Sequence, residues 1–342
     1  MFAIFLERRT MKKIGLTTTV PIEVLIAAGY TPIDLNNLFV TSADYLAYIE
    51  LAEKEGFPKS SCAWTKGIYG ACIQHDIKEV IGVVEGDCSN TKALIEVLKL
   101  KGIEVYPFTF PQEHTIEAVT ESIKIFSKQF KVDEDAVEHT RKHLNRIRRT
   151  AVEIDRLTYE TNQATGFENH LLQLCLSDFN GNPEDYEALL NQKRDEISKR
   201  QENPQMIRLA YIGVPPMTGD LYDFVEGLDA RFVYNEVQRE FAFPRADQAE
   251  NIYEQYFDYT YPYELDFRIA EIEKQLKERN IHGIIHYTQA FCHRAIEDIV
   301  LRDRLKIPML TIEGDKLNEM DARTNLRIEA FVDMIGEIEA GQ

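Results

Sequence analysis

The 342-residue sequence has no run of eighteen or more apolar residues, so it predicts no membrane-spanning helix. Basic residues are few: 39 Lys and Arg stand against 57 Asp and Glu, a formal net charge of -18. A surface of this sign repels nucleic acid and anionic membranes, so we expect neither as a partner. The opening MFAIFLERRTMKK lacks a small-residue cleavage site and makes a poor signal peptide. We therefore expect a cytoplasmic protein that starts at Met1 or Met11.

Cysteine is also scarce, with five residues and no CxxC pair. An odd number excludes a framework in which every thiol is paired, and a reducing cytoplasm keeps thiols free. The missing CxxC excludes a zinc knuckle or a ferredoxin-type cysteine run. Cys72 and Cys175 lie inside helical patterns, and we predict that they are small hydrophobic core residues. Cys62, Cys88 and Cys292 lie outside such patterns and are the candidates for binding metal.

Short apolar runs alternate with helical patterns near both ends of the chain. The predicted strands are residues 13–18, 31–35, 80–84, 103–108, 207–213, 230–234, 283–287 and 308–313. This alternation is typical of parallel sheets with helices on both faces. Residues 114–204 instead show helical periodicity and heavy charge. We therefore predict an α/β protein with two Rossmann-like or flavodoxin-like parallel-sheet domains, residues 1–113 and 205–342, joined by a helical segment.

The two ends of the chain share a layout that indicates internal duplication. In HDIKEVIGVVEGDCSNTKALIEVLKLKGIEVYPF and in RNIHGIIHYTQAFCHRAIEDIVLRDRLKIPMLTI, an apolar strand precedes a cysteine, a helix and a second strand. Cys88 and Cys292 are the equivalent cysteines. Ligands of open parallel sheets bind beyond the carboxyl ends of the strands, so two facing domains would bring both thiols to one cleft. Cys62 lies in a turn before a helix, where free N–H groups favour a thiolate.

Five segments carry a resemblance to a known family. They are KKIGLTTTVPIEVLIAAGYTPIDL, Ser61-Cys62 with the following helix, GDCSN, AFCHRAIED with KIPMLTIEGD, and ARTNLRIEAFVDMI. In this combination the chain resembles, from Met11 onward, the 2-hydroxyacyl-CoA dehydratase family. This D-component family also includes benzoyl-CoA reductase subunits and double-cubane-cluster proteins.

The resemblance implies a [4Fe–4S] cluster held by Cys62, Cys88 and Cys292, or part of an [8Fe–9S] double cubane. It implies an ATP-dependent iron–sulfur activator that supplies a low-potential electron, and an acyl-CoA whose ketyl radical loses water or is reduced. Such an enzyme component is a lyase or a low-potential reductase, and it works as a homodimer or with a related subunit. Three thiolates leave one iron open, which favours chemistry over electron relay alone.

Two further functions fit the same cysteines. The chain could be a double-cubane-type reductase of small molecules, or a non-catalytic partner subunit that carries a cluster. A double cubane within one chain would need more thiolates than the five present, so it would be shared across a dimer or take extra non-protein ligands. The sequence leaves open the substrate, the type of dimer and the choice between a catalytic and an accessory role.

Other side chains near the cysteines are weaker candidates. Three histidines precede or follow Cys292: His282, His286 and His293. One could donate a hydrogen bond or a proton at a bound cluster, but we expect solvated side chains. Glu85 and Asp87 precede Cys88, and they could orient that loop or act as a base, but we expect loop carboxylates in water there. An aromatic stretch could line a substrate or partner surface or pack in the core: Tyr253, Tyr256, Tyr259, Tyr261 and Tyr263.

Overall fold

The first third of the chain forms a four-stranded parallel sheet. The computed structural model describes residues 12–203, 206–242, 248–315 and 319–341, so the choice between Met1 and Met11 as the start lies outside the described residues. The strands are β1 (Lys12–Leu16), β2 (Tyr30–Asp34), β3 (Glu79–Glu85) and β4 (Glu104–Thr109). Their order is β2-β1-β3-β4, and every neighbouring pair is parallel.

The last part of the chain repeats this sheet. The strands are β5 (Ile207–Gly213), β6 (Ala230–Asn235), β7 (Gly283–Gln289) and β8 (Met309–Gly314). The order β6-β5-β7-β8 is parallel throughout and matches the first sheet position by position. The α/β prediction with two parallel-sheet domains is confirmed, and the shared strand order supports duplication. All seven residues of β7 are buried, because helices cover both faces of its sheet.

Helices flank both sheets, as parallel strands require. In the first third of the chain they are α1 (Ile22–Ala27), α2 (Leu35–Val40), α3 (Tyr45–Lys54), α4 (Ala63–Gln74) and α5 (Ser89–Leu100). In the last part they are α10 (Leu221–Glu226), a π-helix (Gln238–Ala242), α11 (Ile252–Phe257), α12 (Leu265–Glu278), α13 (Arg294–Arg304) and α14 (Ala322–Ala340). No helix in the described ranges is both long and apolar enough to cross a membrane.

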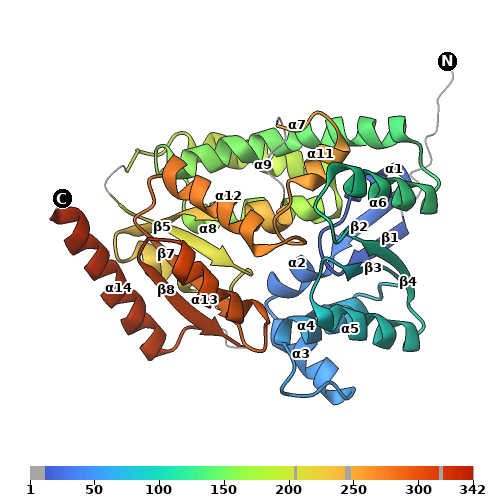
Figure 1. Ribbon diagram of the computed structural model, residues 1–342, viewed down its shortest axis with the longest axis horizontal. Coiled ribbons are helices and arrows are strands. Elements are labelled where there is room, and N and C mark those ends of the chain that lie inside the picture. Colours follow the sequence, from blue (N-terminus) through green and yellow to red (C-terminus); the bar gives the residue numbers. More distant parts are fainter. Residues whose placement is uncertain (1–11, 204–205, 243–247, 316–318, 342) are drawn as a thin grey trace.

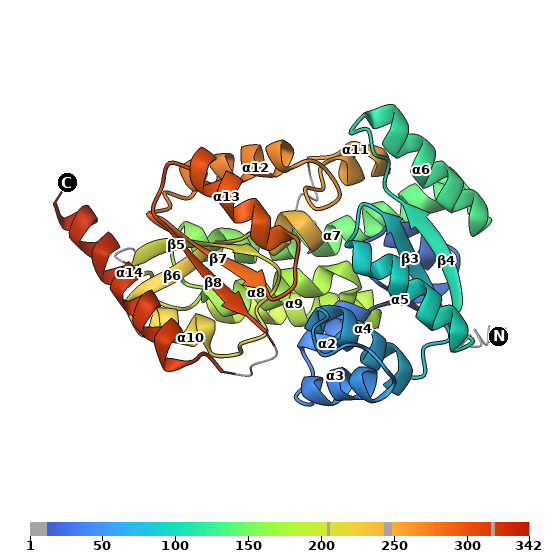
Figure 2. The same cartoon turned by 60° about the horizontal axis from the view of Figure 1, so that its bottom comes forward.

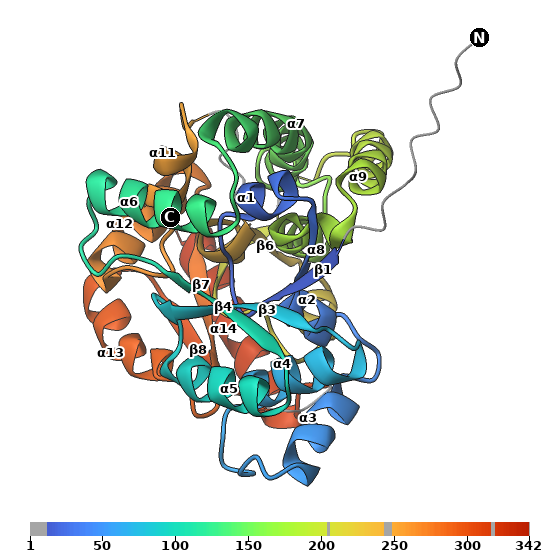
Figure 3. The same cartoon turned by 90° about the vertical axis from the view of Figure 1, so that its right-hand side faces the viewer.

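The middle of the chain is helical, as predicted. Its helices are α6 (Ile116–Gln129), α7 (Glu134–Tyr159), α8 (Gly166–Leu174) and α9 (Pro183–Ile197), with 3₁₀ turns at Cys175–Ser177 and Phe179–Gly181. The long helix α7 extends across the top of Figure 1 from one sheet towards the other. Figure 3 shows α1, α6 and α7 on one side of the first sheet and α4 and α5 on the other.

This helical segment is part of the fold and not a separate bundle. Ile123, Ile147 and Leu190 belong to the same buried apolar cluster as Ile14 and Ile81 of the first sheet. Figure 3 shows α9 beside α7 at the outer edge of the molecule, and in Figure 2 α14 covers the end of the second sheet that lies far from the first. The boundaries at residues 113 and 204 stay predictions, but the segment between them is packed against the first sheet.

Candidate functional site

A pocket of about 90 Å³ collects residues from both sheets. Its lining residues follow the carboxyl ends of four central strands: Thr17, Thr18 and Thr19 after β1, Asp87 and Cys88 after β3, Val214 and Pro215 after β5, and Gln289 and Cys292 around the end of β7. In each sheet the strand order reverses between these two central strands, which is where open parallel sheets bind ligands. Duplication therefore builds one site from two facing half-sites.

Cys62, Cys88 and Cys292 all line this pocket. Cys62 is the N-cap of α4, Cys88 is the N-cap of α5, and Cys292 lies two residues before α13. Burial raises the pKa of each thiol. The charge of a second cysteine raises the pKa of each thiol further. Cys88 acts on Cys62, Cys292 acts on Cys88, and Cys62 acts on Cys292. The three sulfurs are thus mutual neighbours around one space.

Helix N-termini supply hydrogen-bond donors to these sulfurs. The backbone N–H groups of Trp64 and Thr65 face Cys62, while those of Asn90 and Arg294 face Cys88 and Cys292. They oppose the effect of burial, because N–H donors and the positive end of a helix favour the thiolate. Without metal, burial keeps the thiols protonated at neutral pH, so metal binding would release protons.

The donor set suits a cluster better than a single ion. Among the described residues, no three or more His, Cys, Asp or Glu side chains gather closely enough to hold one metal ion. A cubane needs a different arrangement, because each iron binds its own thiolate and the cysteine sulfurs therefore surround the space that the cluster fills. Three thiols on the walls of one pocket, each at a helix N-terminus, fit that arrangement. That they hold iron stays a prediction.

The loop of Cys88 is held by Asp87. The Asp87 carboxylate accepts hydrogen bonds from the Cys88 N–H at 2.6 Å, from the Thr91 hydroxyl at 2.9 Å and from the Tyr261 hydroxyl at 2.8 Å. Burial raises the pKa of Asp87 to about 6, while these hydrogen bonds act in the opposite direction. For Asp87 the structure favours the alternative in which the carboxylate orients this loop, and the expectation of a merely solvated carboxylate was wrong. Glu85 is partly exposed and pairs with Lys92 at 2.8 Å, as expected of a surface carboxylate.

The loop of Cys292 is tied to the same tyrosine. Arg294 is 8% exposed, donates to the Tyr261 carbonyl at 3.0 Å, and lies 4.4 Å from the centre of the Tyr261 ring. Its guanidinium also donates to Glu240 at 2.8 Å. Phe291 has a φ of +64°, a left-handed conformation that is strained for a bulky residue. The chain thus makes a tight turn directly before Cys292.

The wall made by α2 is polar. Asp34, the N-cap of α2, accepts hydrogen bonds from the Asn36 N–H at 2.9 Å and from the Ser177 hydroxyl at 2.6 Å. The Asn37 amide nitrogen donates to Ser177 at 2.9 Å, and its oxygen has no hydrogen-bond partner within the described chain. Asp34, Asn36 and Asn37 all line the pocket. Sequence reasoning missed this short helix, although an Asp N-cap directly after a strand is a recognisable signal.

The remaining candidates lie elsewhere. None of the three histidines is among the described residues that line the pocket. The expectation of a solvated side chain was wrong for His286, which is 1% exposed and pairs with Asp298 at 2.7 Å. Cys72 and Cys175 belong to apolar clusters, and burial raises the pKa of each thiol to about 12. Their predicted place in the core is confirmed. Of the five tyrosines in the aromatic stretch, Tyr261 lines the pocket.

A family comparison covers this whole site. A family model described as "2-hydroxyglutaryl-CoA dehydratase, D-component" matches residues 17–335. The chain belongs to this D-component family. The matched residues include seven of the eight strands, all but β1, and all three pocket cysteines. A search of the curated proteins gave no match. The D-component resemblance seen in the sequence is thereby confirmed, and membership implies a dehydratase-like subunit of an enzyme with more than one subunit.

Proposed function

We propose that this D-component is the iron–sulfur subunit of a 2-hydroxyacyl-CoA dehydratase-like enzyme, with one [4Fe–4S] cluster on Cys62, Cys88 and Cys292. One observation carries the proposal: three mutually neighbouring thiols line the same small pocket as a polar wall. A site for electron relay alone needs no such wall beside the sulfurs. When bound, the cluster would supply a low-potential electron and an iron free to act as a Lewis acid.

The residues of the chain have separate roles in this proposal. The three cysteines hold the cluster, and the helix N–H groups at Thr65, Asn90 and Arg294 stabilise sulfur charge. The α2 wall orients the polar end of the substrate, because its carboxylate and amide oxygens accept hydrogen bonds from a hydroxyl group. Tyr261 and Asp87 keep the cysteine loops of the two sheets in register across the pocket.

The proposal includes partners that the chain does not contain. An ATP-dependent iron–sulfur activator would deliver the electron, and a related subunit or a second copy would complete the enzyme. The electron would convert the thioester carbonyl to a ketyl, and the C2 hydroxyl would take up a proton and leave as water. The C3 proton, made acidic by the radical, would then be lost and the electron returned, so the overall change is 2-hydroxyacyl-CoA to 2-enoyl-CoA plus water. A double cubane is less suited to this chain, since Cys72 and Cys175 are in the core and away from the pocket.

Electron paramagnetic resonance of the anaerobically reconstituted, reduced protein tests the proposal. We expect 2-hydroxyglutaryl-CoA to change the cluster spectrum and glutaryl-CoA, which lacks the hydroxyl, to change it much less. With activator, ATP and partner subunit added, the hydroxyacyl thioester should lose water. If the spectrum of the iron-loaded protein changes with neither thioester, the result would contradict a catalytic role and leave the accessory-subunit alternative.

A further inference from the structure

A second cavity, of about 250 Å³, adjoins the cysteine pocket. It lies between the end of α2, helix α8 and the loop after β5, and Leu174 lines both spaces. In the loop, Pro215 lines the cysteine pocket and the next residue, Pro216, lines the second cavity. A ligand longer than the cysteine pocket could therefore continue past Leu174 into this space.

Two buried polar groups of this cavity have no partner. His170 is 5% exposed and Thr218 is 7% exposed, and within the described chain neither the His170 Nδ1 nor the Thr218 hydroxyl makes a hydrogen bond. Buried polar groups are nearly always satisfied, so two unpaired groups that line one cavity, from helix α8 and from the loop after β5, point to a missing partner. Burial lowers the pKa of His170 to about 3, so the ring is neutral and offers one donor and one acceptor.

The other walls are apolar and uncharged. The rings of Phe167 and His170 flank Tyr222, at centroid distances of 5.7 and 5.1 Å. The Tyr222 hydroxyl is already bound to Asn235 at 2.8 Å, so the ring presents carbon to the cavity. The lining contains no Asp, Glu, Lys or Arg among the described residues. The space therefore suits an uncharged chain with a few polar atoms, and not a phosphate or carboxylate.

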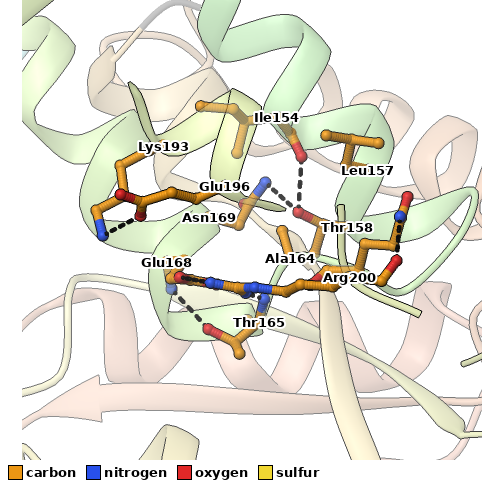
Figure 4. A network of polar contacts seen from close by, with 12 residues as sticks. Ile154, Leu157, Thr158, Ala164, Thr165, Glu168, Asn169, Lys193, Glu196 and Arg200 are labelled. Carbon is orange, nitrogen blue, oxygen red and sulfur yellow. Dashed lines mark hydrogen bonds and ion pairs between the residues drawn. The ribbon is translucent and has the colours of Figure 1, made fainter. Parts of the chain in front are cut away.

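Helix α8 holds its cavity residues in place. Thr165 and Glu168 form a capping box at its start, and Arg200 grips both oxygens of Glu168, at 2.6 and 2.7 Å, as Figure 4 shows. In the same view the Asn169 amide reaches the Thr158 hydroxyl of α7, at 3.0 Å. His170 follows directly on this anchored turn. The wall is thus built before any ligand arrives.

We propose that this cavity binds the amide-bearing pantetheine arm of the acyl thioester, with His170 and Thr218 as its hydrogen-bond partners. This inference rests on the proposed function and adds a binding subsite to it. The arm is uncharged and carries amide N–H and C=O groups, which match the two unpaired side chains. The thioester end would then enter the cysteine pocket beside Leu174.

Isothermal titration of the full-length, iron-loaded protein with S-ethylpantetheine tests the subsite, since the blocked sulfur cannot ligate iron. We expect Thr218→Val and His170→Phe each to raise Kd about tenfold, the loss typical of one buried hydrogen bond. Thr41→Val is the matched control, because Thr41 lines the same cavity but its hydroxyl is already bound to the Asn37 carbonyl at 2.7 Å. Its Kd should stay within twofold of the wild type.

The outcomes separate this inference from the function it rests on. Thr218→Val should leave the iron content unchanged and should not lower the thermal unfolding midpoint without ligand, because it removes an unpaired buried group. Wild-type protein that holds iron but does not bind S-ethylpantetheine, or three variants with equal losses, would overturn the subsite alone. Loss of iron from the wild type would instead contradict the proposed function.

Discussion

Tyr261 donates a hydrogen bond to Asp87 at 2.8 Å and so joins two loops that are 174 residues apart in the sequence. Asp87 precedes Cys88, and Arg294, which follows Cys292, binds the Tyr261 carbonyl at 3.0 Å. One tyrosine therefore connects the cysteine loops of the two sheets. The geometry of the pocket depends on this link as much as on the strands themselves.

Tyr261→Phe should weaken this link and nothing else. Losing one donor to a partly buried carboxylate costs about 1–2 kcal/mol of unfolding free energy, measurable by urea denaturation. Tyr263→Phe is the control, since the buried Tyr263 hydroxyl has no hydrogen-bond partner in the described chain. We expect its unfolding free energy to equal or exceed that of the wild type. Equal losses in both variants would show that the Asp87 contact is unimportant.

Gly86 allows the turn before Asp87. Its φ is +83°, and an added Cβ would lie 2.7 Å from the Cβ of Phe110 and 2.9 Å from that of Pro262. Gly102 has a similar φ of +79° but open space around it. We expect Gly102→Ala to cost about 1 kcal/mol from backbone strain, and Gly86→Ala a further 1–3 kcal/mol, roughly, from overpacking. If denaturation gives equal losses of unfolding free energy for the two variants, the close packing around Gly86 does not contribute to stability.

Arg148 anchors the helical segment to the first sheet region. It is 1% exposed and pairs at 2.7 Å with Glu23, which is fully buried. Arg148→Leu leaves that carboxylate buried without its cation, which should cost about 3–5 kcal/mol. Arg146→Leu is the control: Arg146 lies two residues earlier on the same helix, is exposed and pairs with Glu187 at 3.4 Å, so its loss should cost less than about 1 kcal/mol. A small loss for Arg148→Leu in denaturation would mean that the segment folds independently.

Asp178 should make stability depend on pH. Burial, with the nearby Asp34 carboxylate adding to it, raises the pKa of Asp178 from its usual 3.8 to about 7. The folded protein then binds more protons than the unfolded chain between these values, so stability falls as pH rises from about 4 to about 7. The loss is on the order of 2–4 kcal/mol.

Urea denaturation at pH 5 and pH 8 checks this dependence. Asp178→Asn should remove most of the fall in stability, whereas the exposed Asp223→Asn in α10 should keep the wild-type fall. An Asp178→Asn protein with an unchanged pH dependence would place the responsible proton elsewhere.

Much of the fold follows from local patterns. Runs such as EVIGVVE and GIIHYTQ are short, apolar and rich in β-branched residues, so their strands were predictable. The place of Cys88 and Cys292 past parallel strands also followed from a general rule of open sheets. That rule does not reach Cys62, which follows helix α3 and a turn, so its place beside the other two cysteines was expected from the turn before a helix and from the family resemblance.

The missed features depend on tertiary contacts or on very short elements. Helix α2 has six residues and begins directly where β2 ends, so LNNLFV shows no helical period of its own. Asn36 and Asn37 were therefore not recognised as part of the site. The sequence did not show which of the neighbouring tyrosines belongs to the site. The partners that identify Tyr261, Asp87 and Arg294, are both far from it in the sequence.

Counting iron and sulfide in six anaerobically reconstituted proteins tests the central claim most directly. The wild type should carry about four of each per chain, as one cubane requires. Single alanine variants of Cys62, Cys88 and Cys292 should lose most of this iron, while those of Cys72 and Cys175 should keep it per folded chain. Five variants with the same iron content would contradict the account, because no three of the thiols would then form the site.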